Sequence, residues 1–309
     1  MITSSRILAA TVAVTAPYYL YNVSHSLSSV PTSNTRTESP PPSFVQSQTH
    51  LSVVNPRDHK GVTDSRSITF KLPPSRQSWS DEQILATFVQ GYFGGWVFTP
   101  ERRLLGLLNI LLRRRIVGFS SKLRLDPASS SSSSSSSTTT TTIFPRWIIF
   151  CYQRELKLTL FAAIKDDPGR DQIWSCNDLS PSKLPPLYAT LFGAFQVVDY
   201  HISTHDDDTG TGDSAGESYV DIGFGSDTTH FSGFHRFSVH RGPYDKGDHA
   251  TTESGAKSSS SGTVTITNSS VACNPSANTQ SRLGSLHAFH KVYAMLLFRE
   301  GAARVISTP

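Results

Sequence analysis

The chain has 309 residues, of which 37% are hydrophobic and 17% are charged. Both shares are below the roughly 45–50% and 25% that are usual in globular domains. Stretches rich in Ser, Thr and Pro make up the difference, and the remainder is long enough for one domain with a real core. This composition excludes a wholly disordered protein, a collagen-like fibre and a polytopic membrane protein.

The net charge of +4 is small, and the basic residues are dispersed apart from Arg113, Arg114 and Arg115. Nucleic-acid-binding proteins concentrate basic charge on one face, so we expect no nucleic-acid partner. The three cysteines are widely spaced and form no Cys-x-x-Cys pair. The sequence therefore predicts neither a zinc motif nor a disulfide framework, and we expect no cofactor.

An apolar run over residues 7–16 follows Arg6, and no acidic residue precedes Glu38. The run is shorter than the about 20 residues that a membrane span needs. It is typical of a targeting signal or an anchor, although its alternation also fits a first strand. We expect membrane contact only through this run, and a cytoplasmic location if it is no signal. Residues 1–64 are predicted to be this segment followed by a disordered linker, because residues 24–64 lack apolar periodicity.

The folded part is predicted to begin with a strand over residues 67–72. Ser80 and Gln83 have the spacing of a capping box, and apolar residues then recur at helical spacing until two glycines end the helix. Pro100 marks the first turn of a second helix, since proline costs no hydrogen bond there.

The rest of the chain predicts mainly strands and one long helix. The strands are expected over two parts of 147–164 and over 195–202, 218–224, 230–240 and 263–271; the helix is expected over 284–303. Residues 65–306 are thus predicted to be a single domain, with disordered insertions at 127–142, 204–217 and 241–262. The order of elements indicates an α+β fold in which a C-terminal helix covers one face of an antiparallel sheet.

Four segments carry a resemblance to a known family: residues 100–119, 192–199, 225–239 and 283–299. They resemble a mostly bacterial family of uncharacterised proteins, a domain of unknown function related to the SRPBCC, or START-like, superfamily. The matching motifs are Gly225-x-Asp227-x-x-His230 and Phe289-His290-Lys291. The resemblance covers about 66–125 and 190–305.

This resemblance implies a helix-grip fold, in which a curved antiparallel sheet packs around a long C-terminal helix and two short helices follow the first strand. It also implies a cavity between sheet and helix that often holds an apolar small molecule or lipid. The family has no established activity, so no reaction follows from it. Gly225, Asp227 and His230 are expected to form a structural motif, with His230 fixing the loop after Gly225.

Histidines of the C-terminal half are the main candidates for chemistry. On a strand, His235 shares a face with Phe237, whereas Arg236 points to the other face. We expect the polar contacts to a ligand to come from His235, Arg236, His290 and Tyr293. His287, His290 and His235 could supply imidazole ligands to a metal, but no His-Glu-x-x-His motif or suitably spaced carboxylate supports such a site, and no metal is predicted.

Three hypotheses remain open from the sequence. The first is a binding module for a small apolar or amphipathic ligand. The second is an enzyme on the same scaffold with His235 or His290 as general acid or base, because histidine titrates near neutral pH. The third is an interaction protein whose interior is filled by its many aromatic side chains.

Overall fold

The computed structural model describes residues 4–112, 116–119, 171–203, 217–242, 263–279 and 284–307. The strands predicted within 147–164 and the insertion at 127–142 lie outside these residues. So do the insertions at 204–217 and 241–262, apart from Glu217, Arg241 and Gly242.

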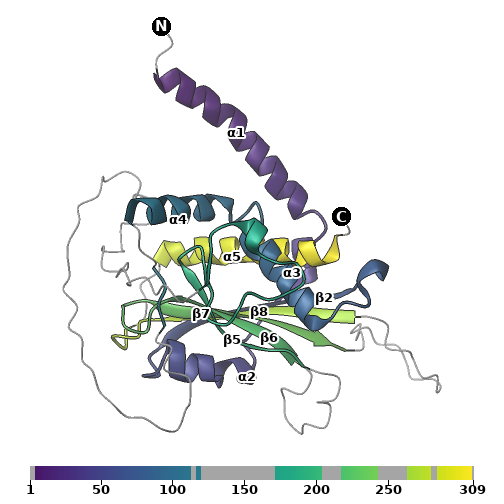
Figure 1. Cartoon of the computed structure of the whole chain (residues 1–309), viewed down its shortest axis with the longest axis vertical. Coiled ribbons are helices and arrows are strands. Elements are labelled where there is room, and N and C mark those ends of the chain that lie inside the picture. Colours follow the sequence, from purple (N-terminus) through teal and green to yellow (C-terminus); the bar gives the residue numbers. More distant parts are fainter. Residues whose placement is uncertain are drawn as a thin grey trace.

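The described residues form an α+β fold built on one curved, open sheet of eight strands (Figure 1). The strands are β1 (Thr35–Glu38), β2 (Gly61–Lys71), β3 (Gln172–Ile173), β4 (Thr190–Leu191), β5 (Phe195–His201), β6 (Glu217–Gly225), β7 (Ser232–Arg241) and β8 (Thr263–Cys273). Their order across the sheet is β1-β2-β8-β7-β6-β5-β4-β3. Neighbours are antiparallel except β3 and β4, so the sheet is mixed rather than wholly antiparallel as expected.

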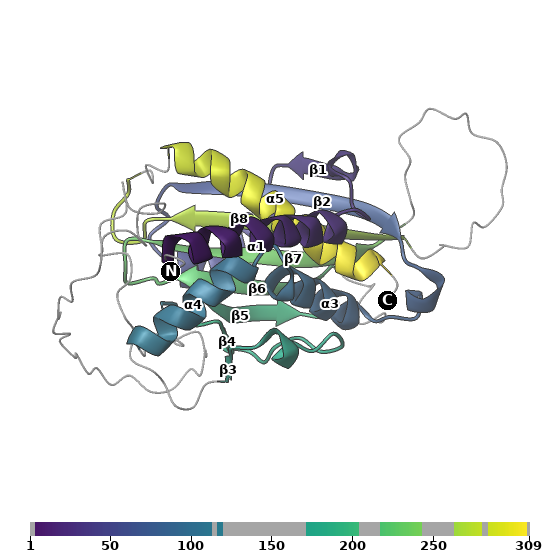
Figure 2. The ribbon, with the colours of Figure 1, turned by 90° about the horizontal axis from the view of Figure 1, so that it is seen from above.

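Three helices cover one face of this sheet, namely α3 (Asp81–Gly94), α4 (Thr99–Leu112) and α5 (Gly284–Ile306), as Figure 2 shows from above. The predicted capping box is confirmed, since the Ser80 hydroxyl accepts from the Gln83 amide at 3.2 Å and the Gln83 side chain accepts from the Ser80 amide at 2.9 Å. Helices α3 and α5 approach closely at Gly91, where a Cβ atom would lie 3.0 Å from the Gly301 Cα. Helix α5 lies over the sheet and shares an apolar cluster with it, so the predicted packing of a C-terminal helix on a sheet is confirmed.

The opposite face of the sheet is covered by residues 42–54, which we call the strap. The strap contains α2 (Pro42–Val45) and a short π-helical turn, η2 (Thr49–Val54). Its Phe44 ring stacks on Phe234 of β7 with 4.6 Å between centroids, and both side chains are fully buried. The sequence predicts only a linker here, because two apolar anchors in a Ser/Thr-rich stretch leave no periodic signal.

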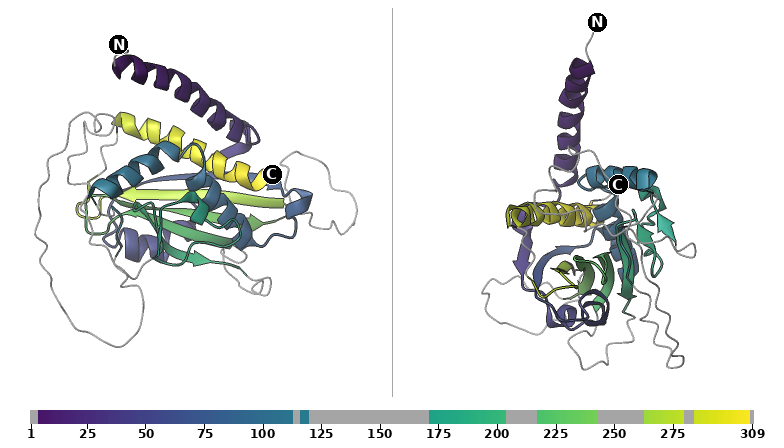
Figure 3. Two further views of the ribbon diagram at one scale, coloured as in Figure 1. Left: turned by 45° about the horizontal axis from the view of Figure 1, so that its top comes forward. Right: turned by 90° about the vertical axis from the view of Figure 1, so that its left-hand side faces the viewer.

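The N-terminal apolar run belongs to a helix, α1 (Ser4–Ser26), and not to a strand. Figure 3 shows α1 rising away from the sheet, with its C-terminal end against α5. There the Ser26 hydroxyl donates to the Glu300 carboxylate at 2.9 Å. Within the part of the chain that the structure describes, none of the helices has the length and apolar character to cross a membrane.

The buried apolar side chains form two separate clusters, one on each face of the sheet. The larger cluster lies between the sheet and helices α3 and α5 and contains Phe88, Phe93, Phe237 and Phe298. The smaller cluster lies under the strap. Alternation along the strands explains the division: neighbouring residues of β7, such as Arg236 and Phe237, point to opposite faces.

Candidate functional site

Four buried polar side chains meet on the face of the sheet that α3 and α5 cover. We call them the helix-side cluster: Arg66 of β2, Tyr92 of α3, His235 of β7 and Asn268 of β8, each at most 5% exposed. Arg66 and Asn268 are directly opposite each other in the β2–β8 register, so their side chains are neighbours. The Tyr92 ring centroid lies 5.9 Å from the His235 ring.

Three atoms of this cluster make no well-formed hydrogen bond within the described structure, although the Asn268 side chain lies close enough to His235 and Tyr92 to influence the pKa of both. They are Arg66 Nε, His235 Nδ1 and Asn268 Oδ1, and all three are buried. The rest of the Arg66 guanidinium is engaged, because it pairs with Asp64 and donates to the Lys291 carbonyl at 3.3 Å. An unpaired buried polar atom costs about 1–3 kcal/mol, so three of them on adjacent strands need a physical explanation.

Burial determines the protonation state of the cluster. Desolvation, together with the nearby charge of His290, lowers the pKa of His235 to about 3. Burial and the charge of Glu101 raise the pKa of the Tyr92 hydroxyl. Near pH 7 the His235 ring is therefore neutral, with one donor and one acceptor nitrogen, and the Tyr92 phenol keeps its proton.

The α5 side of the cluster is closed by a contact between two helices. The Tyr293 hydroxyl donates to the Glu101 carboxylate of α4 at 2.8 Å. Burial raises the pKa of Glu101, and the bond from Tyr293 opposes that shift. Close by on α5, Phe289 is 59% exposed, whereas Phe298 further along is fully buried. The described beginning of α5 is therefore only loosely covered.

The structure brings together three of the four residues that the sequence predicts as ligand contacts. His235 is in the cluster, Tyr293 lies beside it, and His290 is exposed on α5 with its charge acting on His235. Arg236 lies on the opposite face, under the strap, because it alternates with His235 along β7. These four side chains therefore do not share one site.

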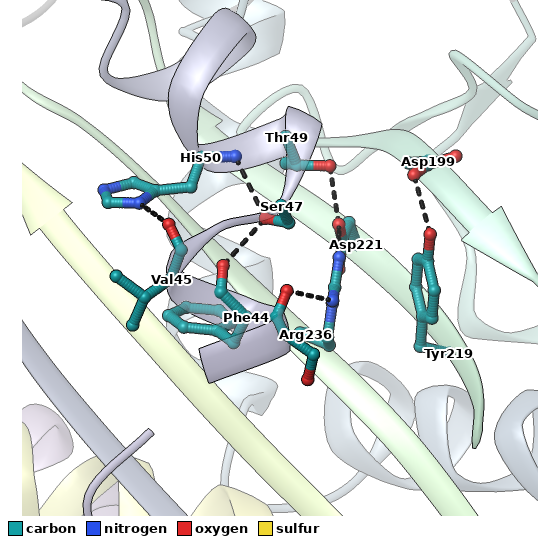
Figure 4. Close-up of polar contacts among 10 residues, drawn as sticks. Phe44, Val45, Ser47, Thr49, His50, Asp199, Tyr219, Asp221 and Arg236 are labelled. Carbon is teal, nitrogen blue, oxygen red and sulfur yellow. Dashed lines mark hydrogen bonds and ion pairs between the residues drawn. The ribbon is translucent and has the colours of Figure 1, made fainter. Parts of the chain in front are cut away.

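Figure 4 shows where Arg236 goes instead. Its Nε and Nη2 atoms each donate to the Asp221 carboxylate at 2.7 Å, and the Thr49 hydroxyl of the strap donates to the same carboxylate at 2.6 Å. The guanidinium also donates to the Ser43 carbonyl at 3.3 Å and lies 3.9 Å from the centroid of the Tyr219 ring. This buried ion pair holds the strap on the sheet.

The predicted structural motif lies at the turn between β6 and β7. Gly225 has a φ of +75°, and a Cβ atom there would collide with the Phe231 carbonyl, so only glycine fits. His230 is exposed and its Nδ1 lies 2.6 Å from the Ser276 hydroxyl. Asp227 is half-buried within the turn. All three residues are distant in sequence from the β2 and α3 members of the helix-side cluster.

Three members of the helix-side cluster were missed as site residues from the sequence: Arg66, Tyr92 and Asn268. Tyr92 recurs at helical spacing with apolar and aromatic residues, a pattern that indicates core packing rather than a site. A signal for the other two exists, because each interrupts the apolar face of its strand at a period-two position, beside Ile68 and Ile266. That signal is meaningful only once the strands are known to be adjacent.

Two further features bear on ligands. Among the described residues there is no group of three or more His, Cys, Asp or Glu side chains that could hold a metal ion. The side chain of His287 lies outside the part of the chain that the structure describes. A hollow of about 300 Å³ lies at the α3–α4 junction and is lined by Gly94, Gly95, Trp96, Thr99, Arg102 and Arg103.

Comparison of the chain with protein-family models, with curated proteins and with solved structures finds no match in any of the three.

Proposed function

We propose that this chain is a helix-grip domain that binds a small apolar or amphipathic molecule between its sheet and α5. The observation that carries the proposal is the set of unpartnered buried atoms of Arg66, His235 and Asn268. A ligand that reaches these atoms would satisfy them. The curved sheet and the helix on it support the architecture, and the sequence resemblance described above supports the location.

The chemistry of the cluster indicates the kind of ligand. Arg66 Nε can only donate, Asn268 Oδ1 can only accept, and a neutral His235 can do either at Nδ1. A carboxyl, hydroxyl or carbonyl head on the ligand matches such a set. Phe237 and Ile68 lie on the same face beside these groups and offer an apolar surface for the body of the ligand.

The beginning of α5 is the natural place for a ligand to enter. His290 and Tyr293 lie on this part of the helix, next to exposed Phe289. The other end of α5 is fixed, because Arg76 donates to the carbonyls of Arg304 and Val305 at 2.8 and 2.5 Å. Movement of the first turns of α5 would open the cluster without unfolding the domain.

A filled interior is the second candidate, and the aromatic packing favours it. The centroid of the Phe237 ring lies 5.1 Å from that of Phe88 and 6.4 Å from that of Phe93. In that case the domain would be an interaction protein without a ligand. The enzyme hypothesis loses support from His235, because a base with a pKa of about 3 accepts protons poorly near pH 7.

Native mass spectrometry of the full chain, purified from cells and compared with its denatured mass, tests the proposal. The full chain is needed because the strap and α1 contact the rest of the domain. We expect a co-purifying apolar molecule and binding of a dansyl-labelled fatty acid. If the chain carries no ligand and binds neither this probe nor a panel of lipids and sterols, the proposal is wrong. The interaction protein with a filled interior would then be the better interpretation.

A matched pair of variants localises the site. Asn268→Leu removes a buried amide whose Oδ1 has no well-formed hydrogen bond and replaces it by an apolar group of similar size. We expect about tenfold weaker probe binding. The free energy of unfolding should fall by about 1 kcal/mol, because the variant also loses the contact of Asn268 with Tyr92 and His235. Thr190→Val is the control, because it removes a buried unpartnered hydroxyl on β4, away from α5. Equal binding by both variants would contradict a site at the cluster.

A further inference from the structure

Helix α4 has an apolar outer face that no described part of the chain covers. Leu104, Leu107 and Ile110 recur at helical spacing and are exposed, Leu107 by 45% and Ile110 by 74%. The opposite side of the helix is also apolar and packs on the core through Leu105. A surface helix normally turns charged or polar residues to solvent, so the outer face of α4 needs another apolar environment.

Two other helices on this side of the sheet also expose apolar side chains. Helix α1 exposes Val14, Tyr18 and Tyr21, and the beginning of α5 exposes Phe289 and Val292. Figures 1 and 3 show α1, α4 and α5 on the same side of the sheet, opposite the strap. We refer to the exposed apolar side chains on this side of the sheet, from α1, α4 and α5, as the outer apolar face.

The charges around this face are basic. Arg102 and Arg103 line the 300 Å³ hollow at the α3–α4 junction, and Arg102 is held there by donating to the Phe93 carbonyl at 2.8 Å and to the Thr99 hydroxyl at 3.0 Å. Arg103 and Lys291 are exposed. Helix α1 contains no acidic residue, and neither does the part of α5 from 284 to 293.

The two carboxylates nearest the hollow are already engaged. Glu300 is buried and accepts from the Trp96 and Val97 amides at 2.7 and 2.8 Å, and Glu101 accepts from Tyr293. They offer no exposed negative charge to repel an anion. An approaching surface would therefore meet arginine, lysine, tyrosine hydroxyls and apolar side chains.

We propose that the outer apolar face docks onto a lipid bilayer that contains anionic phospholipids. The apolar side chains of α4, α1 and α5 enter the boundary between headgroups and acyl chains, while Tyr18 and Tyr21 keep their hydroxyls at headgroup level. The arginine-lined hollow receives a headgroup phosphate, which guanidinium groups bind well. The combination of basic charge with exposed aromatic and aliphatic residues favours a membrane over a protein partner.

Vesicle flotation with the full chain tests this surface. We expect binding to phosphatidylcholine vesicles that contain phosphatidylserine, weaker binding to phosphatidylcholine alone, and a further decrease at high salt. The double variant Leu107→Ser/Ile110→Ser removes two exposed side chains, so folding is preserved, and the partition coefficient should fall at least about tenfold. Arg103→Gln should lower binding to the anionic vesicles selectively.

Leu51→Ser is the matched control, because Leu51 is also 45% exposed but lies on the strap, on the opposite side of the sheet. Its vesicle binding should equal that of the unchanged chain. Undiminished binding by the double variant, or an equal loss with Leu51→Ser, would overturn the proposal. A dimer in solution that Leu107→Ser dissociates would also overturn the proposal, because a second copy would then cover the face.

Asn268→Leu should leave vesicle binding unchanged, which separates this surface from the ligand site.

Discussion

His235 is a histidine that the fold holds in its neutral form. Burial lowers its pKa from 6.5 to about 3. In the unfolded chain the ring takes up a proton as the pH falls through about 6.5, but the folded chain excludes that proton. The stability linked to this group is therefore complete above the unfolded pKa and is lost progressively as the pH falls towards 3.

Replacing His235 by Phe should flatten the acid side of the stability profile. Between pH 7 and pH 5 the unchanged chain should lose about 2 kcal/mol more of its free energy of unfolding than His235→Phe does. Urea unfolding at both pH values measures the difference. Buried carboxyls such as Asp221 are common to both chains and cancel. Parallel profiles would show that folding does not lower the pKa of His235.

Gly95 is required for a different reason, namely close packing. A Cβ atom at this residue would collide with the Glu300 carboxylate that caps the start of the α3–α4 junction. Gly95→Ala should lower the free energy of unfolding by about 1–3 kcal/mol. Gly106→Ala is the control, because a Cβ atom there meets nothing within 4 Å and alanine favours a helix by about 0.5–1 kcal/mol. Denaturation curves of the two variants should move in opposite directions.

Among the elements, the strap determines whether the second face of the sheet is closed. Phe44 fills the apolar part of that face, and Thr49 donates to the buried Asp221–Arg236 pair. Cys273 lies beneath the strap, with its Sγ 3.8 Å from the Val54 carbonyl. Burial raises the pKa of the Cys273 thiol to about 11, so it is unreactive while the strap is in place.

The reactivity of Cys273 therefore reports whether the strap is docked. In a chain with Cys151 and Cys176 replaced by Ser, we expect very slow reaction with a disulfide reagent. Phe44→Ala should accelerate the reaction several-fold by loosening the strap, whereas Leu51→Ala should not, since Leu51 is largely exposed. If Phe44→Ala left the rate unchanged, the strap would not be what protects the thiol.

Elements with strong local signals could be predicted from the sequence. Each of these signals lies within a few residues of the chain. The capping box at Ser80 and the proline at position 100 mark the starts of two helices, and alternation marks β7; the structure contains all three elements. The strap could not be predicted in this way. Its anchors, Phe44 and Val54, are isolated in a polar stretch, and their role depends on apolar residues of strands that come much later in the chain.

At the scale of the whole molecule, the candidate site depends on pairings between distant segments. His235 was found from the sequence because it is a titratable residue within an apolar strand. Asn268 and Arg66 became site residues only through the β2–β8 register, which joins residues such as Ser65 and Ser269 that are 204 positions apart. Local patterns carry no information about such a register, so the cluster could be predicted only in part.

The same register governs how the chain can fold. Strand β2 occupies the space between β1 and β8, and the end of α1 is fastened to α5 by the Ser26–Glu300 bond and by Arg299, which donates to the Val30 carbonyl at 2.6 Å. During synthesis β1 and β2 can pair with each other early, but the other edge of β2 and the end of α1 have no partner until nearly the whole chain has been made. The fold has a high contact order and closes large loops late, which makes folding slow and leaves the early strands exposed to aggregation in the meantime.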